Sequence, residues 1–326
     1  MKNWVLLFRP WSYVATLVPF WVAAGIVASW KPHEEVARWG YWTLGLVSGL
    51  LFQATVNLLN TWGDERSGVD DVPGAIRTTP QIHDGLVSMR ALLVAAVTCA
   101  ALAAALGVAL CFYRQGDVWR LNVPLLVAGF IGFLGSTNYS TGIKFKYRGL
   151  GVPFVSFLMG PLEIFVALAL LHPVFARESL LMLAFPPFLL GAILLTLPIA
   201  ALVGVVMHGN DMRDIPTDRA AGIVTLASRL GPKGALRYYR ICHALPYGVT
   251  LCLTGIFLFR YGGFQWGFTW LWLPFLALPL SIRTMIIATR VYRSCPENPP
   301  WRKLERASGA ILLVYGTLYA LSFALA

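Results

Sequence analysis

Long apolar runs alternate with short polar segments along almost the whole chain. A helix that crosses a membrane needs about 20 predominantly apolar residues, and nine runs come close to or exceed that length. They cover residues 11–30, 39–60, 91–113, 121–139, 151–171, 180–207, 241–260, 264–287 and 309–326. The pattern predicts an all-α integral membrane protein with nine transmembrane helices, in which residues 1–326 form one domain.

The composition supports a lipid environment. Of the 326 residues, 57% are apolar and only 13% are charged, whereas a soluble domain carries about 25% charged residues. The first ten residues lead directly into an apolar run without a small-residue cleavage site, so we expect no secretory signal peptide. The five cysteines have no CxxC spacing, and we interpret them as small apolar core residues.

The net charge of +11 is distributed in a way that indicates membrane topology. If the N-terminus is inside, 20 of the 26 lysines and arginines fall in inner segments and 6 in outer ones. By the positive-inside rule, this distribution predicts an inside N-terminus and an outside C-terminus. We expect contact with membrane lipid and no binding of nucleic acid, because the basic segments are short and flanked by spans.

Acidic residues gather in two of the inner segments, although a positive-inside loop has no topological need for them. Eight of the 15 acidic residues lie there: Asp64, Glu65, Asp70, Asp71 and Asp84 after the second run, and Asp211, Asp214 and Asp218 after the sixth. Neighbouring carboxylates repel one another unless a cation lies among them. Either cluster alone is compatible with a solvated loop, but two clusters at matching helix ends predict a cation site.

Spacing brings the polar side chains of the first cluster together. If the helix of the second run continues to its polar end, Asn57, Asn60 and Asp64 stand at i, i+3 and i+7, on one face. A turn after that helix would bring Asp70 or Asp71 back to the same point.

The second cluster repeats this spacing with Asp211, Asp214 and Asp218, although Pro216 requires that the helix start or bend nearby. Mg²⁺ is typically held by a few carboxylates together with waters and phosphate oxygens. Two such clusters facing one another would clamp a diphosphate through Mg²⁺ ions.

A third inner segment, residues 139–151, interleaves basic residues with glycines. Its candidate binding residues are Tyr139, Lys144, Lys146 and Arg148. Lysine and arginine neutralise an oxyanion, and glycine lets backbone N–H groups approach it. The segment therefore predicts binding of a diphosphate, with a simple positive-inside anchor as the alternative.

Residues 210–218 read N-D-M-R-D-I-P-T-D. This sequence, with the stretch 222–231 after it, resembles the second aspartate-rich motif of the UbiA superfamily of intramembrane prenyltransferases. The first cluster departs from the family pattern, because Thr61 and Gly68 stand where aspartates are common. Its N-x-x-N…D-x-x-x-G-x-D form, with Y-R-G-L-G at 147–151, resembles instead the 1,4-dihydroxy-2-naphthoate polyprenyltransferase branch of menaquinone biosynthesis. Val152 replaces the acidic residue usual in that branch.

The resemblance implies a UbiA-like helical bundle with its active site at the cytoplasmic side, in a bacterial or archaeal inner membrane. It implies transfer of a polyprenyl group from polyprenyl diphosphate to an aromatic acceptor such as 1,4-dihydroxy-2-naphthoate, with Mg²⁺ as cofactor. We expect Asp64, Asp214 and Asp218 to be catalytic. The expected metal ligands are Asp64, Asp70, Asp71, Asp211, Asp214 and Asp218, and the expected substrate-binding residues are Asn57, Asn60, Arg66, Tyr139, Lys144, Lys146, Arg148, Arg213 and Glu163.

Glu163 lies inside the fifth apolar run, where an ionisable side chain is costly and suggests a function. It could orient the hydroxyl group of the acceptor or act as a base. A simple hydrogen bond between helices is the alternative.

Two other functions are compatible with parts of this pattern. The first is a related transferase that uses 4-hydroxybenzoate, homogentisate or a lipid as acceptor. The second is a secondary transporter, which would carry its charges near the membrane midplane; here the charges gather at one side. The sequence leaves open the length of the prenyl chain and the oligomeric state, so an oligomer is compatible with it.

Overall fold

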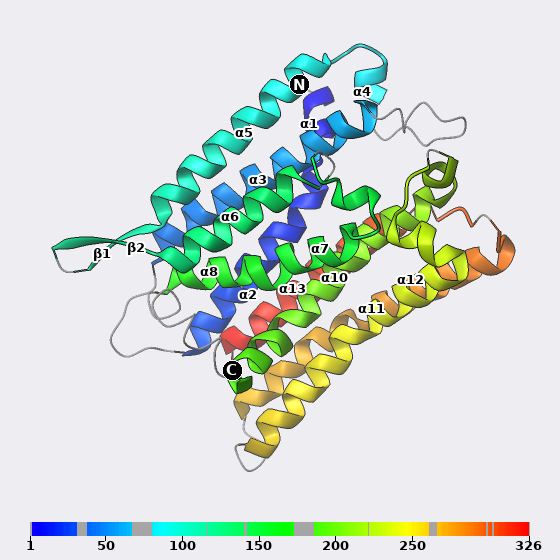
Figure 1. Cartoon of the computed structure of the whole chain (residues 1–326). Coiled ribbons are helices and arrows are strands. Elements are labelled where there is room, and N and C mark those ends of the chain that lie inside the picture. Colours follow the sequence, from blue (N-terminus) through cyan, green and yellow to red (C-terminus); the bar gives the residue numbers. More distant parts are fainter. Residues whose placement is uncertain are drawn as a thin grey trace.

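The computed structural model describes residues 2–30, 38–66, 80–115, 117–139, 142–172, 186–220, 222–260, 266–297, 299–301 and 303–325. Within these ranges the long helices are α2 (Val14–Trp30), α3 (Trp39–Arg66), α5 (Met89–Leu110), α6 (Val123–Thr137), α10 (Pro186–Ala220), α11 (Leu226–Arg260), α12 (Leu278–Ser294) and α13 (Leu304–Leu325). They run side by side along one direction (Figure 1). The predicted all-α membrane architecture is confirmed.

Shorter elements complete the bundle. One further rod is built from α7 (Gly151–Phe157), the π-helical turn η4 (Leu158–Leu162) and α8 (Glu163–Leu171), and the 3-10 helix η5 (Trp266–Ala277) leads into α12. The remaining helical pieces are α1 (Lys2–Phe8), η1 (Pro10–Tyr13), α4 (Pro80–His83) and η3 (Phe145–Tyr147).

Eight of the described helical segments are long and apolar enough to cross a membrane, and α6 is a ninth, shorter apolar helix. Figure 1 places the two termini at opposite ends of the bundle, as an odd number of crossings requires. We call the end at which α3 and α10 finish the acidic end, because it carries Asp64 and Asp218, and the opposite end the distal end.

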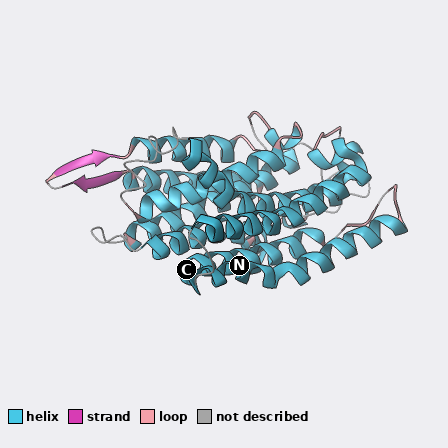
Figure 2. Cartoon of the chain, turned by 90° about the horizontal axis from the view of Figure 1, so that it is seen from below, coloured by secondary structure: helices cyan, strands magenta, loops and turns pink. Residues whose placement is uncertain are grey.

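A small antiparallel hairpin interrupts the helical pattern at the distal end. Strands β1 (Phe112–Gln115) and β2 (Val118–Leu121) pair with Phe112 opposite Leu121, and they project beyond the helices (Figure 2). The apolar pattern had assigned parts of these strands to the third and fourth spans. The strands are rich in aromatic and β-branched residues, and because these side chains are apolar, the ends of the hairpin were counted as parts of the neighbouring spans.

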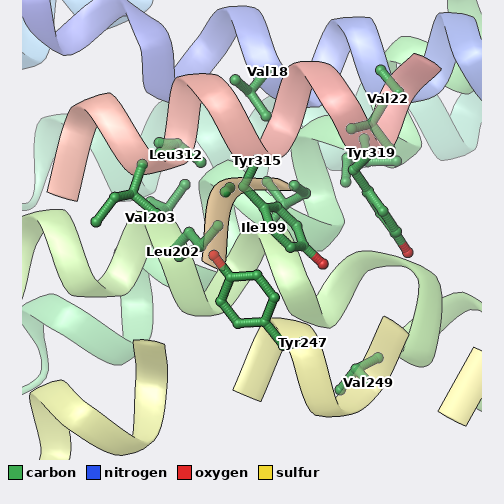
Figure 3. Close-up of a cluster of buried hydrophobic side chains, with 14 of the residues drawn as sticks. Val18, Val22, Ile199, Leu202, Val203, Tyr247, Val249, Leu312, Tyr315 and Tyr319 are labelled. Carbon is green, nitrogen blue, oxygen red and sulfur yellow. The ribbon is translucent and has the colours of Figure 1, made fainter. Parts of the chain in front are cut away.

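The largest core cluster joins α2, α10, α11 and α13 (Figure 3). Three of its buried tyrosines have hydrogen-bond partners: the hydroxyl of Tyr247 pairs with Ser281 Oγ at 2.7 Å, that of Tyr315 donates to Pro246 O at 3.1 Å, and that of Tyr319 donates to Leu195 O at 3.0 Å. Gly25 of α2 lies against the backbone of Ala320, where a side chain would not fit. Small residues of this kind allow two membrane helices to approach closely.

The acidic ends of α10 and α11 are helical for longer than predicted. The sixth apolar run ends at residue 207, but α10 continues to Ala220. The seventh run begins at residue 241, but α11 begins at Leu226 and is kinked at Gly231, where the backbone is not helical. A second apolar cluster stabilises these extensions, because Met212 and Ile215 of α10 pack with Ala235 and Tyr239 of α11. The second acidic cluster therefore lies on a helix and not in a loop.

Candidate active site

A cavity of about 1000 Å³ opens among the helices and extends from the acidic end toward the distal end. Polar side chains of α3, α10 and the 142–150 segment line it at the acidic end. Further along, apolar residues of α5, α6, α7 and α8 take over, among them Val108, Leu126, Phe133 and Val166. The cavity thus joins a charged region to an apolar one.

One face of α3 lines the cavity with Asn57, Asn60 and Asp64. The amide of Asn57 donates to Phe8 O at 2.8 Å and to Ser12 Oγ at 2.9 Å, so it holds the junction between α1 and α2. Asn60 Oδ1 is buried and has no hydrogen-bond partner among the described residues. The amide nitrogen of Asn57 is therefore occupied by bonds within the protein, whereas the side-chain oxygen of Asn60 is available to a ligand.

Asp64 receives donors from η3 across the cavity mouth. Lys146 Nζ lies 2.7 and 2.9 Å from its two carboxylate oxygens, and the hydroxyl of Tyr147 donates to Oδ1 at 2.7 Å. Burial disfavours the Lys146 ammonium, but Asp64 and the neighbouring tyrosine hydroxyls outweigh this effect and raise the pKa of Lys146 above its ordinary value. Lys146 therefore contributes a positive charge to the site.

The last turns of α10 present Asp211, Asp214 and Asp218 to the same cavity. Arg213 pairs with both oxygens of Asp214 at 2.6 Å and with Glu305 Oε2 of α13 at 3.2 Å. The hydroxyl of Thr225 donates to Asp218 Oδ2 at 3.1 Å. Pro216 lies inside the helix, which continues through it.

The two acidic clusters face one another across Lys146. Asp218 is close enough to Lys146 and to Asp64 for their charges to interact, and Asp211 also interacts with Lys146. The structure therefore brings the α3 and α10 clusters to one point, as the matching spacings predict.

Three of the predicted substrate-binding residues lie away from the cavity. Arg66 is exposed and stacks over Trp62 with 5.0 Å between the guanidinium carbon and the ring centroid. Lys144 and Arg148 are also exposed. Lys144 adopts a left-handed backbone conformation at the start of η3, and this turn directs Lys146 inward between them.

The remaining candidates are placed as follows. Tyr139 is buried and lines the cavity, as does Arg213, and Glu163 lines its apolar part. Asp70 and Asp71 lie outside the described residues.

Sequence reasoning missed four side chains of the site. They are Arg9, Tyr147, Thr225 and Glu305. Glu305 carried a signal, because it is an isolated acidic residue shortly before the last apolar run. Arg9 carried a signal too, because it is a charged residue directly before Pro10, where η1 begins, and the first apolar run.

The residues present suit Mg²⁺ coordination. Asn60 Oδ1 and Asn210 Oδ1 are buried acceptor oxygens without donors among the described residues, and they lie beside the carboxylates of α3 and α10. In the part of the chain that the structure describes, no group of three or more His, Cys, Asp or Glu side chains is arranged to hold a metal ion by itself. Mg²⁺ seldom needs one, because waters and substrate phosphate oxygens commonly complete its shell.

Comparison with known proteins identifies this architecture. The model of the UbiA prenyltransferase family matches residues 12–302. Human UbiA prenyltransferase domain-containing protein 1 is 28% identical over 338 residues, which cover 99% of this chain and 84% of the human protein. The Drosophila melanogaster homologue of that protein is 26% identical over 294 residues, covering 87% of this chain and 70% of its own.

Solved structures of UbiA homologues have a similar fold. A UbiA homologue from Archaeoglobus fulgidus, bound to GPP and Mg²⁺, superposes with a TM-score of 0.61 at 16% identity and covers 99% of both chains. A digeranylgeranylglyceryl phosphate synthase superposes with a TM-score of 0.54 at 13% identity. With a family model that matches most of its length and a bundle of the same fold, this chain belongs to the UbiA prenyltransferase family and is an integral-membrane prenyltransferase.

Proposed function

We propose that this prenyltransferase carries out Mg²⁺-dependent transfer of a polyprenyl group from polyprenyl diphosphate to an aromatic acceptor. The observation that carries the proposal is the meeting of two carboxylate-bearing helix ends, α3 and α10, at the mouth of a cavity that becomes apolar further in. The carboxylate-bearing mouth of the cavity suits a diphosphate with bound cations. The apolar part further in suits an isoprenoid tail.

The diphosphate would lie at the acidic end. Asp64, Asp211, Asp214 and Asp218, with the unpartnered amide oxygens of Asn60 and Asn210, are the groups that would hold Mg²⁺ there. The bound ions would neutralise the negative charge that develops on the leaving group. Lys146 and Arg213 lie in the same region and would bind the remaining phosphate oxygens by charge-assisted hydrogen bonds.

The reaction balances as an ionisation followed by a substitution. The bond between C1 of the donor and the bridging oxygen breaks, and diphosphate leaves with the electron pair. A ring carbon of the acceptor then bonds to C1, and the ring loses a proton, or CO₂ where that carbon carries a carboxylate. The apolar part of the cavity supports this mechanism, because it excludes the water that would otherwise capture the allylic cation.

For the acceptor we propose 1,4-dihydroxy-2-naphthoate, which would place the enzyme in menaquinone biosynthesis. The support is the resemblance of the first acidic motif and of residues 147–151 to that branch. The human and Drosophila relatives carry no acceptor in their names, so 4-hydroxybenzoate, homogentisate and a lipid remain outcomes of the test. We also propose that the acidic end faces the cytoplasm, on the basis of the distribution of lysines and arginines.

The test is an assay of the purified protein with Mg²⁺, a labelled prenyl diphosphate and a panel of these acceptors. We expect a prenylated, decarboxylated naphthoquinol product with dihydroxynaphthoate and far less product with the others. Efficient prenylation of a different acceptor would replace the acceptor assignment. No transfer to any acceptor, with intact folded protein, would contradict the proposed reaction.

A further inference from the structure

The outer face of α12 carries arginines among exposed apolar side chains. The opposite face packs into the bundle, because Ser281, Thr284 and Ala288 are buried there and the hydroxyl of Ser281 pairs with that of Tyr247 of α11 at 2.7 Å. Figure 1 shows α11 and α12 side by side along one edge of the bundle. Helix α12, which the structure describes over its whole length, contributes no residue to the active-site cavity. Its outer face therefore borders the surrounding membrane.

A groove of about 730 Å³ follows this outer face, and we call it the α12 groove. Arg283, Ile286, Ile287 and Arg290 line it at positions i, i+3, i+4 and i+7, which lie on one side of a helix. The side chains of Ile286 and Ile287 are 45% and 44% exposed, so no other helix covers them. The α12 groove thus joins an apolar floor to two positive charges.

The two arginines have no counter-charge within the described part of the protein. The ion pairs found there lie at the active-site cavity, on Lys146 and Arg213. Both arginines of the groove belong to the segment Trp270–Ser294, which is long and apolar enough to cross a membrane. Arg283 is 11 residues from the end of this segment, or about 16 Å along a helix. A charged side chain at that depth is costly, which makes it a candidate for a specific function.

The direction of α12 matches the shape of a phospholipid. The chain passes from α12 into α13, whose first turn holds Glu305 beside Arg213, so α12 runs toward the acidic end. Arg290 is therefore nearer the membrane surface than Arg283, by about 10 Å along the helix. Apolar lining continues from Arg283 in the other direction to Phe275 of η5. A head group fits the arginine end of the groove, and acyl chains fit the rest.

Charge complementarity selects this occupant over two others. A second copy of the chain on a twofold axis would bring the same arginines toward one another, and like charges repel. A free phosphate ion would satisfy the arginines but leave the isoleucines of the groove uncovered. An anionic phospholipid satisfies both, because arginine binds phosphate by charge-assisted hydrogen bonds and long arginine side chains can extend along a helix to the membrane surface.

We propose that the α12 groove binds one anionic phospholipid, with its phosphate group between Arg283 and Arg290. The acyl chains lie over Ile282 and Leu278 and point away from the acidic end. The positive choline group of phosphatidylcholine opposes the arginines, so the groove prefers phosphatidylglycerol. This site is separate from the active-site cavity and does not depend on the identity of the donor or the acceptor.

The experiment measures lipid binding to the full-length protein in detergent by native mass spectrometry. Phosphatidylglycerol and phosphatidylcholine with identical acyl chains are titrated separately, and the readout is the ratio of the two Kd values for the first bound lipid. For the wild-type protein we expect a preference of about 25-fold for phosphatidylglycerol. Each arginine near a membrane surface contributes about fivefold to the binding of an anionic lipid, and the groove has two.

Charge-neutral variants test the two arginines one at a time. Arg283→Gln and Arg290→Gln should each lower the preference about fivefold, and the double variant should bind both lipids about equally. Arg293→Gln is the matched control, because it removes the same charge from an exposed position of the same helix outside the groove. It should stay within about twofold of wild type. A thermal melt of each variant checks the fold.

Two further measurements keep the test decisive. Ile286→Glu leaves both arginines in place but puts a carboxylate three and four residues from them, where ion pairs form on a helix. This variant should lose most of the preference for phosphatidylglycerol. An excess of inorganic phosphate should not displace the bound lipid from the wild-type protein, because the ion has no acyl chains to occupy the apolar floor.

Several outcomes would overturn the inference. They are a wild-type preference near one, an unchanged preference in Arg283→Gln and Arg290→Gln, and an equal loss in Arg293→Gln, which would indicate diffuse attraction to the basic surface. Displacement by inorganic phosphate would indicate a simple anion site. A dimer that excludes the lipid in every variant would show that a second copy covers the groove. None of these measurements involves turnover, so the proposed function would still stand.

Discussion

On α10, Asp214 is paired with Arg213 of the same helix, whereas on α3 Asp64 is paired with Lys146, which a separate segment supplies. Arg213 is also tied to Glu305 of α13 at 3.2 Å. The α10 cluster thus carries its own counter-charge and an anchor to a neighbouring helix. The α3 cluster is balanced by a residue 82 positions away in the chain.

The α10 and α3 ends therefore have different roles in the same site. The α10 end is preorganised, because its partners lie on packed helices. The α3 end depends on the docking of η3, which brings a cation and a tyrosine hydroxyl to Asp64. A ligand that binds at Asp64 has to share it with Lys146, and the predictions below probe this asymmetry.

The largest effect is expected when a carboxylate is removed from either end. Asp64→Ala and Asp218→Ala should each lower kcat by about a hundredfold to a thousandfold, the range seen when one group that stabilises transition-state charge is lost. We expect the protein to fold, because both side chains lie at the wall of the cavity. Turnover in detergent measures the activity, and a thermal melt measures the stability of the fold. Near-normal activity in either variant would show that the substituted residue is not part of the site.

Removal of the shared cation should have the next largest effect. Lys146→Gln should lower kcat/KM for the prenyl donor by roughly tenfold to a hundredfold, because a charge-assisted hydrogen bond is worth about 1.5–3 kcal/mol. Less Mg²⁺ should be needed for half-maximal rate, since no ammonium competes for Asp64. Lys144→Gln is the matched control and should stay within about twofold of wild type, as expected of an exposed charge. Equal losses in both variants would contradict the assigned geometry.

The two asparagines of α3 should separate stability from metal binding. Asn57→Ala breaks the hydrogen bonds to Phe8 O and Ser12 Oγ and should lower the free energy of unfolding by about 1–3 kcal/mol. Asn60→Ala breaks no hydrogen bond of its side chain oxygen and should instead raise the Mg²⁺ concentration needed for half-maximal rate. Thermal melts and Mg²⁺ titrations of both variants check this contrast, which fails if the two variants behave alike.

The anchor of the α10 end should give the smallest effect. Glu305→Gln keeps a hydrogen-bond acceptor for Arg213 but removes the charge, and charge-assisted hydrogen bonds are about twice as strong as neutral ones, so we expect only a roughly threefold loss in kcat/KM. A loss as large as that of Asp218→Ala would mean that Glu305 itself contacts the substrate.

Much of the fold followed from the apolar runs, because the membrane requires long helices and leaves a strong pattern. The exceptions have physical causes. The third and fourth apolar runs were predicted to reach residues 113 and 121, but the aromatic and β-branched side chains there belong to the strands 112–115 and 118–121 of a hairpin. Pro216 suggested that the helix starts or bends nearby, yet α10 continues through Pro216, and Met212 and Ile215 pack against α11 there.

The site was predictable where it follows helical spacing and was not where it depends on a turn. Asn57, Asn60 and Asp64 share a face because of their i, i+3, i+7 positions, and so do the aspartates of α10. Sequence alone could not choose between Lys144 and Lys146, because the choice depends on the left-handed backbone of Lys144 at the start of η3. Glu163 was recognisable as unusual, but its place on the cavity wall required the structure.

The most direct test of the central claim, that both helix ends hold one diphosphate through Mg²⁺, is equilibrium binding of a labelled prenyl diphosphate without acceptor. The full-length protein, Asp64→Ala and Asp218→Ala would each be measured with Mg²⁺ and with a chelator. We predict that wild-type binding requires Mg²⁺ and that each variant binds at least about tenfold more weakly in Mg²⁺. Binding that persists in the chelator, or that is lost in only one of the two variants, would contradict the account.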